Sequence, residues 1–190
     1  VLDNYINDDV KPVDEEVDVF FYGRIEPYKG LDLLIQSANK LKKDIKFFIA
    51  GGGDIYKAYP KLGNIPDNVR LLGYLDDEML ISYIKASKVV VFPYREASGT
   101  MTICQCCYYG KPMIVSNTGV LPEYVGDGGV IIKKHNVEEL TKAITDILDN
   151  DKYRKTLENN AKKQYMRLFR MEKVIDKHKE LLTDVMVIQK

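Results

Sequence analysis

The sequence lacks a net charge, because Lys and Arg together number 28 and so do Asp and Glu. A balanced chain has no field of one sign that would draw nucleic acid or anionic lipid to its whole surface. Its apolar fraction of 45% also excludes the composition of a disordered chain. We therefore expect a folded domain without a nucleic-acid partner.

Cysteine is scarce, and the three that occur, Cys104, Cys106 and Cys107, are crowded into one short stretch. An odd, clustered set cannot form the disulfide framework of a secreted protein. Adjacent cysteines face different ways on a helix, and no histidine stands nearby to complete a metal site. We expect three buried structural thiols, no metal, and a reducing cytoplasmic location.

Long apolar runs are absent too. The longest, at 89–94, has the size of a strand and falls far below the ~20 residues needed to cross a bilayer. The chain begins at Val1 rather than Met and continues with an acidic stretch. We expect residues 1–16 to be a linker or former interdomain segment, and residues 17–190 to form one domain that includes C-terminal helices.

What the chain does contain is a regular alternation of strand-like and helix-like segments. Short apolar runs predict strands at 19–22, 45–50, 68–72, 89–93, 112–116 and 130–132. Strands of this buried type, separated by helices and without hairpin signals, indicate an α/β fold, namely a doubly wound parallel sheet with helices on both faces.

Helices are predicted from apolar residues at helical spacing. One covers 31–41, one crosses the cysteines and ends at Gly110, and one is capped by Asp76 or Asp77. Asn136 and Glu139 form a capping-box-like start for another. Residues 151–190 are expected to be helical throughout, as a C-terminal tail.

In an open parallel sheet, ligands bind beyond the carboxyl ends of the strands, so the turns there are the places to search. Gly23, Arg24 and Lys29 follow the first strand. A guanidinium and an ammonium from one turn are suited to a pyrophosphate. The competing interpretation is a solvated loop with two surface cations.

Glycine is concentrated after the second strand, at Gly51, Gly52 and Gly53. Glycines remove side chains where a ligand or a neighbouring backbone comes close. A flexible turn explains them nearly as well, and their spacing is not that of a dinucleotide-binding motif.

After the fourth strand a turn becomes a helix at Ser98, Gly99, Thr100 and Met101. Unpaired amides and the positive end of the helix dipole make such a place suitable for an anion. Glu96, just upstream, can accept hydrogen bonds from sugar hydroxyls. Its alternative role is that of an acid at a helix entry.

Five stretches together resemble the carboxyl-terminal domain of glycosyltransferase family 4. They are GRIEPYKG at 23–30, AGGG at 50–53, NVRLLGYL at 68–75, VVVFPYREASG at 89–99 and YGKPMIVSNTGVLPE at 109–123. They occur in order over 18–148. The resemblance implies a GT-B architecture of two facing Rossmann-like domains, of which this chain is the donor-binding half.

The activity that the resemblance implies is a metal-independent, retaining transfer of a sugar from a UDP- or GDP-linked donor to an unknown acceptor. It needs no cofactor, and the fragment is expected to be inactive without its amino-terminal acceptor-binding domain. The resemblance assigns catalysis to Arg24, Lys29 and Glu96. It assigns the nucleotide sugar to Gly23, Arg24, Lys29, Gly51, Gly52, Gly73, Tyr74, Ser98, Gly99, Thr100, Met101 and Gln105, with the base along Gly73 and Tyr74.

The sequence departs from the family at one carboxylate. The family has two glutamates eight positions apart, and here the second falls on Cys104 or Gln105, while Glu96 matches the first with an offset of one residue. Gln105 can still bind a ribose hydroxyl as a neutral partner. The loss keeps open an alternative function, a catalytically impaired nucleotide-binding or interaction module. A nucleotide-sugar epimerase or a sugar phosphorylase is disfavoured, because no lysine context typical of a cofactor is present.

Basic residues between 152 and 179 alternate with acidic and apolar ones, which is typical of an exposed helix face. A peripheral association of the full-length protein with the inner membrane face remains open as a second interpretation of these residues.

Overall fold

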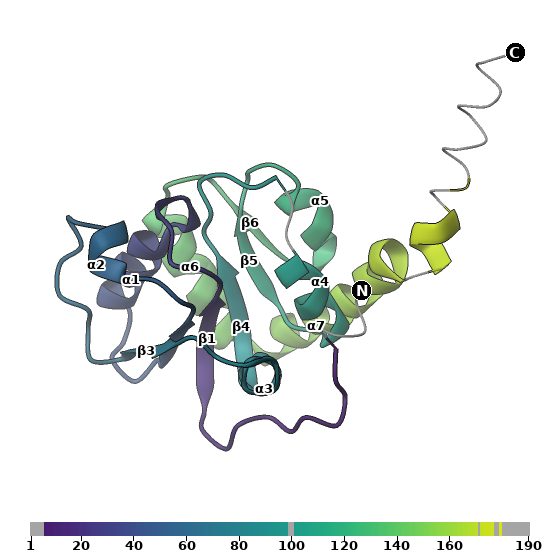
Figure 1. The fold of residues 1–190 in the computed structure, drawn as a ribbon, viewed down its shortest axis with the longest axis horizontal. Coiled ribbons are helices and arrows are strands. Elements are labelled where there is room, and N and C mark those ends of the chain that lie inside the picture. The colour runs from purple at the N-terminus through teal and green to yellow at the C-terminus, as the bar shows by residue number, and fades with distance from the viewer. Residues whose placement is uncertain (1–5, 99–100, 171, 177–178, 180–190) are drawn as a thin grey trace, which may run out of the picture.

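The computed structural model describes residues 6–98, 101–170, 172–176 and 179. Its centre is a sheet of six parallel strands in the order β3-β2-β1-β4-β5-β6 (Figure 1). This confirms the predicted doubly wound α/β fold. The strands are β1 (Val17–Tyr22), β2 (Phe47–Ala50), β3 (Val69–Gly73), β4 (Ser87–Phe92), β5 (Met113–Ser116) and β6 (Gly129–Ile132).

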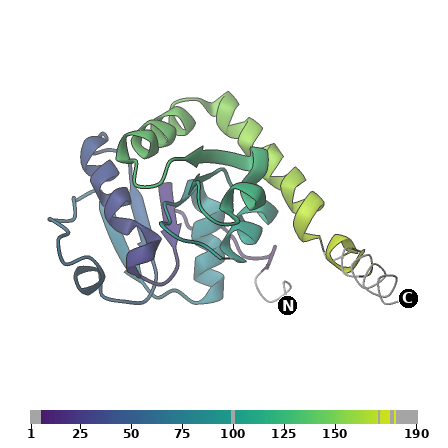
Figure 2. The same cartoon turned by 90° about the horizontal axis from the view of Figure 1, so that it is seen from above.

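Helices cover both faces of the sheet, which is why the central strands are mostly apolar. All six residues of β1 are buried, and so are all four of β2 and of β5. Figure 1 shows α4 on one face and α6 on the other, and the view from above in Figure 2 shows helices on both sides of the sheet. The helices are α1 (Leu31–Lys40), α2 (Ile55–Ala58), α3 (Asp77–Ala86), α4 (Met101–Tyr108), α5 (Leu121–Val125), α6 (Val137–Leu148) and α7 (Asp151–Gln164).

The structure contains the helix starts predicted at Asp76 and Asn136, with one difference in the hydrogen bonds of the second. Asp76 caps α3 by accepting a hydrogen bond of 2.8 Å from the amide of Met79. Asn136 caps α6 in the same way, through the amide of Glu139 at 2.9 Å. The Glu139 carboxylate accepts instead from the amide of Lys133, so the capping box is only half formed.

The prediction that the tail is helical throughout is wrong at Arg170. After α7 the chain makes a wider π-helical turn (Tyr165–Phe169), and Arg170 is extended, with φ −60° and ψ 132°. Tyr165 and Phe169 pack edge-on against Tyr108 and Tyr124, at ring-centroid distances of 5.1 and 5.3 Å. Tertiary packing of this kind outweighs local helix preference. Residues 172–176 are helical again, as predicted. The expected helix over residues 171, 177–178 and 180–190 lies outside the described residues.

Two one-turn helices, α2 and α5, are not among the predicted elements. Each is too short to show a helical repeat of apolar residues. Asp54 caps α2 by accepting from the amides of Tyr56 and Lys57, and Pro122 stands in the first turn of α5. Caps and a starting proline are local signals that form a turn without an apolar stripe.

The three cysteines are buried free thiols, as predicted. Burial raises the pKa of Cys104 to about 11 and that of Cys106 to about 12. A thiol that stays protonated is a weak nucleophile, so these residues act as core side chains.

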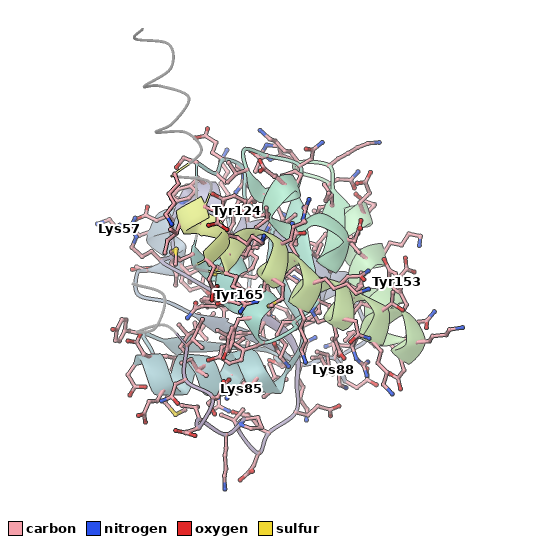
Figure 3. All side chains as sticks on the ribbon, turned by 90° about the vertical axis from the view of Figure 1, so that its right-hand side faces the viewer. Lys57, Lys85, Lys88, Tyr124, Tyr153 and Tyr165 are labelled. Atoms are coloured by element: carbon pink, nitrogen blue, oxygen red, sulfur yellow. The ribbon has the colours of Figure 1, made fainter. Side chains whose placement is uncertain are left out.

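The segment before β1 is fastened to the domain. The Lys85 ammonium, on α3 (Figure 3), donates to the backbone carbonyls of Asn7, Asp8 and Val10 at 2.7–3.0 Å. The Tyr108 hydroxyl donates to the Asp8 carboxylate at 2.6 Å. Residues 6–16 therefore have a fixed course on the domain, and their role as an interdomain linker stays a prediction. Residues 1–5 lie outside the described part of the chain.

None of the described helices has the length and apolar character needed to span a bilayer.

Candidate functional site

The loops that follow β1, β2 and β3 lie side by side at the carboxyl edge of the sheet. The amide of Gly23 donates to the carbonyl of Ala50, and the amide of Gly51 donates to that of Gly73, at 2.9 and 2.7 Å. Ile25 donates in the same way to Gly52. The structure thus brings the predicted glycines 23, 51, 52 and 73 together along one rim.

Glycine stands at these positions for different physical reasons. At Gly51, where φ is +155°, a Cβ would lie 1.8 Å from the carbonyl oxygen of Gly23, so the backbones of two loops meet there. Gly52 and Gly73 border open space, because a Cβ added at either would meet nothing within 4 Å among the described residues. Tyr74, next to Gly73, is 81% exposed. The rim is therefore tightly joined at Gly51 and open near Gly73 and Tyr74.

The turn that carries Lys29, the 3-10 helix η2 (Pro27–Lys29), is held by Arg95 at the end of β4. The Arg95 amide donates to the Tyr28 carbonyl, and its guanidinium donates to the Pro27 carbonyl, both at 2.7 Å. The same guanidinium reaches both oxygens of Asp32 at 2.9 and 2.6 Å. Both contacts come from one guanidinium nitrogen, Nη2, and add a charge-assisted hydrogen bond to the two that Arg95 makes to the turn.

A second set of contacts holds the turn from the other side. The Tyr59 hydroxyl donates to the Glu26 carbonyl at 2.6 Å and accepts from the amide of Leu31 at 3.1 Å. Gly30 has φ +69°, and a Cβ there would lie 2.0 Å from the carbonyl oxygen of Pro93. The loop after β1 therefore packs directly on the end of β4, in a position that only glycine permits.

A cavity of about 390 Å³ opens where these loops meet, lined by Tyr28, Lys29, Tyr94, Glu96, Ala97 and Ser98. The Lys29 ammonium lies 3.9 Å from the centroid of the Tyr94 ring and 5.2 Å from that of Tyr28. Of the predicted site residues, the structure thus brings Lys29, Glu96 and Ser98 to one cavity.

Lys29 brings a partly desolvated cation to this cavity, whose lining also includes the Glu96 carboxylate. Burial lowers the pKa of Lys29 to about 8, the nearby charge of Arg24 lowers it further, and the charge of Glu26 opposes the shift. Within the described residues, the Lys29 ammonium forms no hydrogen bond or ion pair with a protein group. Arg24 is exposed at the same rim. Two neighbouring cations, neither of them ion-paired within the described part of the chain, favour an anion with more than one negative charge.

The loop after β4 is held toward the start of α4. The Thr118 hydroxyl donates to the Arg95 carbonyl at 3.2 Å, and a Cβ on Gly119 would lie 1.7 Å from the carbonyl oxygen of Ala97. Met101, the first residue of α4, is 46% exposed. The predicted binding residues Gly99 and Thr100 lie outside the described residues.

Cys104 and Gln105, where the second carboxylate of the resembled family is missing, both belong to the buried side of α4. They are 2% and 5% exposed. The Gln105 oxygen accepts a hydrogen bond of 3.2 Å from the Tyr22 hydroxyl. The structure thus shows Gln105 in contact with the core. Its proposed role in ribose binding stays a prediction.

A larger cavity of about 760 Å³ lies between α1 and residues 58–64, and it shares Tyr28 and Glu96 with the smaller one. Two charges at this larger cavity, on Asp32 and Arg95, are already paired with each other. Lys61 also lines the larger cavity and is exposed, whereas the Lys29 ammonium at the smaller cavity is partly buried and forms no ion pair among the described residues. The smaller cavity is therefore the better candidate for an anion site.

Sequence reasoning missed four residues that shape the site: Asp32, Tyr59, Tyr94 and Arg95. Tyr94 and Arg95 follow the fourth strand at the edge where ligands are expected, so their position alone was a usable signal. Asp32 and Tyr59 act from a helix and a loop elsewhere in the chain, and no local pattern marks them.

Among the described residues, no group of three His, Cys, Asp or Glu side chains is arranged to hold a metal ion.

Comparison with known proteins gives matches over most of the chain. A family model described as Glycosyl transferases group 1 matches residues 5–164. The D-inositol 3-phosphate glycosyltransferase of Mycolicibacterium smegmatis is 31% identical over 153 residues, which are 74% of this chain and 34% of that protein.

Solved structures share the fold. Sucrose-phosphate synthase from Thermosynechococcus elongatus has a TM-score of 0.77 at 22% identity, covering 94% of this chain and 50% of that one. Anabaena Alr3699/HepE, in complex with UDP-glucose, has a TM-score of 0.73 at 19% identity, covering 90% and 49%. The chain thus spans half or less of the length of these proteins, and its fold is the Rossmann-like unit found in GT-B glycosyltransferases.

Proposed function

The chain belongs to the glycosyl transferases group 1 family, and on that premise we propose that it is the donor-binding domain of a retaining, family 4 glycosyltransferase with GT-B architecture. The donor is a nucleotide diphosphate sugar, linked to UDP or GDP. Because the chain covers 34% of the D-inositol 3-phosphate glycosyltransferase, we propose that the acceptor is bound by a separate amino-terminal domain. Alone, this domain binds the donor and transfers little or no sugar.

One observation carries the proposal: Lys29 is partly desolvated, forms no ion pair with a protein group among the described residues, and lies near Arg24 at the carboxyl edge of the sheet. In this role Lys29 and Arg24 neutralise the diphosphate that leaves when the sugar is transferred. Fixed cations can stabilise that leaving group, so we propose that no metal ion or cofactor takes part. The structural neighbour in complex with UDP-glucose supports a donor of this class.

The remaining groups are proposed to bind the other parts of the donor. Glu96, exposed at the same cavity, accepts hydrogen bonds from the sugar. The base lies along the open rim at Gly73 and Tyr74, and the amides from Gly99 to Met101 add donors for the phosphates.

Titration of the domain with UDP and GDP by isothermal calorimetry tests this function. We expect one of them to bind, and Arg24→Ala or Lys29→Ala to weaken binding about 10- to 100-fold, the effect of losing a charge-assisted hydrogen bond. Lys155→Ala, at an exposed lysine of α7, is the matched control and should leave the affinity unchanged. Absence of binding by every nucleoside diphosphate would contradict the proposal.

A second candidate, a catalytically impaired module that still binds nucleotide, is favoured by the burial of Cys104 and Gln105 where a carboxylate is expected. Joining the domain to its amino-terminal half and measuring donor hydrolysis or sugar transfer separates the two. Measurable turnover rules out the impaired module, whereas nucleotide binding without turnover in the joined protein supports it.

A further inference from the structure

Tyr94 is the most firmly fixed aromatic residue of the cavity. It is 1% exposed, and its ring meets those of Phe21, Phe92 and Tyr28 edge-on, at centroid distances of 6.4, 5.6 and 6.3 Å. Edge-to-face contacts on several sides leave one ring orientation. The Tyr94 ring is therefore a rigid surface at the end of β4.

Lys29 places its ammonium over that surface. The nitrogen is 3.9 Å from the Tyr94 centroid, well within the ~6 Å at which a cation is attracted to an aromatic face. The contact with Tyr28 is longer, at 5.2 Å. A Cβ on Gly23 would lie 3.7 Å from the Lys29 nitrogen and 3.8 Å from the Tyr94 oxygen, so Gly23 borders this pair.

The backbone beneath Lys29 is fixed by the residue next to Tyr94, Arg95, through its contacts with Tyr28, Pro27 and Asp32. Two consecutive residues at the end of β4 thus act on one turn. Arg95 holds the main chain, and Tyr94 meets the end of the side chain. A lysine side chain with four rotatable bonds, and without an ion pair among the described residues, loses much rotamer freedom on binding unless another group holds it beforehand.

We propose that Tyr94 is a positioning residue, whose ring holds the Lys29 ammonium in the cavity before the diphosphate arrives. This inference rests on the proposed function for its effect on binding, since Tyr94 acts on the donor only through Lys29. Preorganisation of this kind removes part of the ordering cost that the ligand would otherwise meet.

Substitutions at Tyr94 test this through the affinity for UDP or GDP, whichever the wild-type domain binds. Tyr94→Leu removes the aromatic face and keeps an apolar side chain, and we expect about fivefold weaker binding. Tyr94→Phe keeps the face and should stay within about twofold of wild type. Thermal unfolding of each variant verifies that it is folded.

A double-mutant cycle separates positioning from a general structural effect. If Tyr94 acts through Lys29, Tyr94→Leu introduced into Lys29→Met will change the affinity by less than about twofold. An equal fivefold loss in both backgrounds would overturn the proposal, as would an unchanged affinity for Tyr94→Leu alone.

A further measurement needs no nucleotide. In NMR spectra of the free domain, the Lys29 methylene protons next to the ammonium should be shifted upfield by the Tyr94 ring in wild type and Tyr94→Phe, and not in Tyr94→Leu. Ordinary shifts in wild type would overturn the contact. If the upfield shift is present and no nucleoside diphosphate binds, the proposed function fails while the positioning of Lys29 by Tyr94 is supported.

Discussion

Two partly buried lysines lie near opposite ends of β4, and burial lowers the pKa of both to about 8. Lys111 is near the amino end, where its ammonium donates to the carbonyls of Lys85 and Ser87 at 2.5 and 3.0 Å. Lys29 is near the carboxyl end, where its ammonium meets the faces of two tyrosines. The two residues share a lowered pKa and differ in their partners.

The difference shows that a shifted pKa does not identify a functional residue by itself, because desolvation affects any buried amine. Lys111 uses its hydrogens to join the end of α3 to the start of β4, so it completes the fold. In the proposed function, Lys29 donates its hydrogens to the diphosphate that enters the cavity. The carboxyl edge, where strand ends leave open loops, is where ligands bind in such sheets, and Lys29 has no hydrogen-bond acceptor there among the residues that the structure describes.

Replacing each lysine separately tests this difference most strongly. Lys111→Met leaves two carbonyls without their donor, and we expect the free energy of unfolding to fall by about 3 kcal/mol. Lys29→Met removes a desolvated charge that has no protein hydrogen bond among the described residues, and we expect a change below about 1 kcal/mol. Urea denaturation measures both, and equal losses would show that the two lysines have the same structural role.

The pH dependence of nucleotide binding sharpens the comparison. Below pH 8 Lys29 is charged and attracts the diphosphate, and above pH 8 the free domain loses that charge. From pH 7 to pH 9 we therefore expect the affinity for UDP or GDP to fall about tenfold, one factor of ten for one pH unit beyond the pKa. Calorimetry at the two pH values measures it. A profile that is as steep in Lys29→Met as in wild type would assign the titration to another group.

The smallest expected effect comes from Lys29→Arg. A guanidinium stays charged at pH 9 and still meets an aromatic face, so the affinity at pH 7 should stay within about threefold of wild type. The fall between pH 7 and pH 9 should disappear, since no ionisation remains in that range. The same calorimetric series provides the comparison, and a persisting tenfold fall would contradict the assignment to Lys29.

Much of the fold was predictable, because the central strands are buried on both faces and appear in the sequence as apolar runs. The caps at Asp76 and Asn136 were predictable for a local reason, since the side chain bonds an amide three residues on. The continuous helix expected across Arg170 was wrong, because aromatic packing of Phe169 against Tyr124 lies outside any local pattern.

The site was predictable in part. Arg24, Lys29 and Glu96 follow strand ends, so their common edge follows from the parallel topology. The orientation of Gln105 could not be predicted, because residues on α4 show no clear difference between a core face and a ligand face in the sequence. Its contact with Tyr22 joins residues 83 positions apart.

By itself the sequence determined the alternation of strands and helices, and with it which turns share the carboxyl edge, because burial and local hydrogen bonding leave patterns in neighbouring residues. Only the tertiary structure decided that Lys111 is committed to carbonyls and that Lys29 faces tyrosine rings. Arg95, which fixes the Lys29 turn, bonds Asp32 across 63 positions. Desolvation and the choice of partner depend on groups that folding brings together from distant parts of the chain. They determine the charge state of a lysine, but no pattern in the neighbouring residues predicts them.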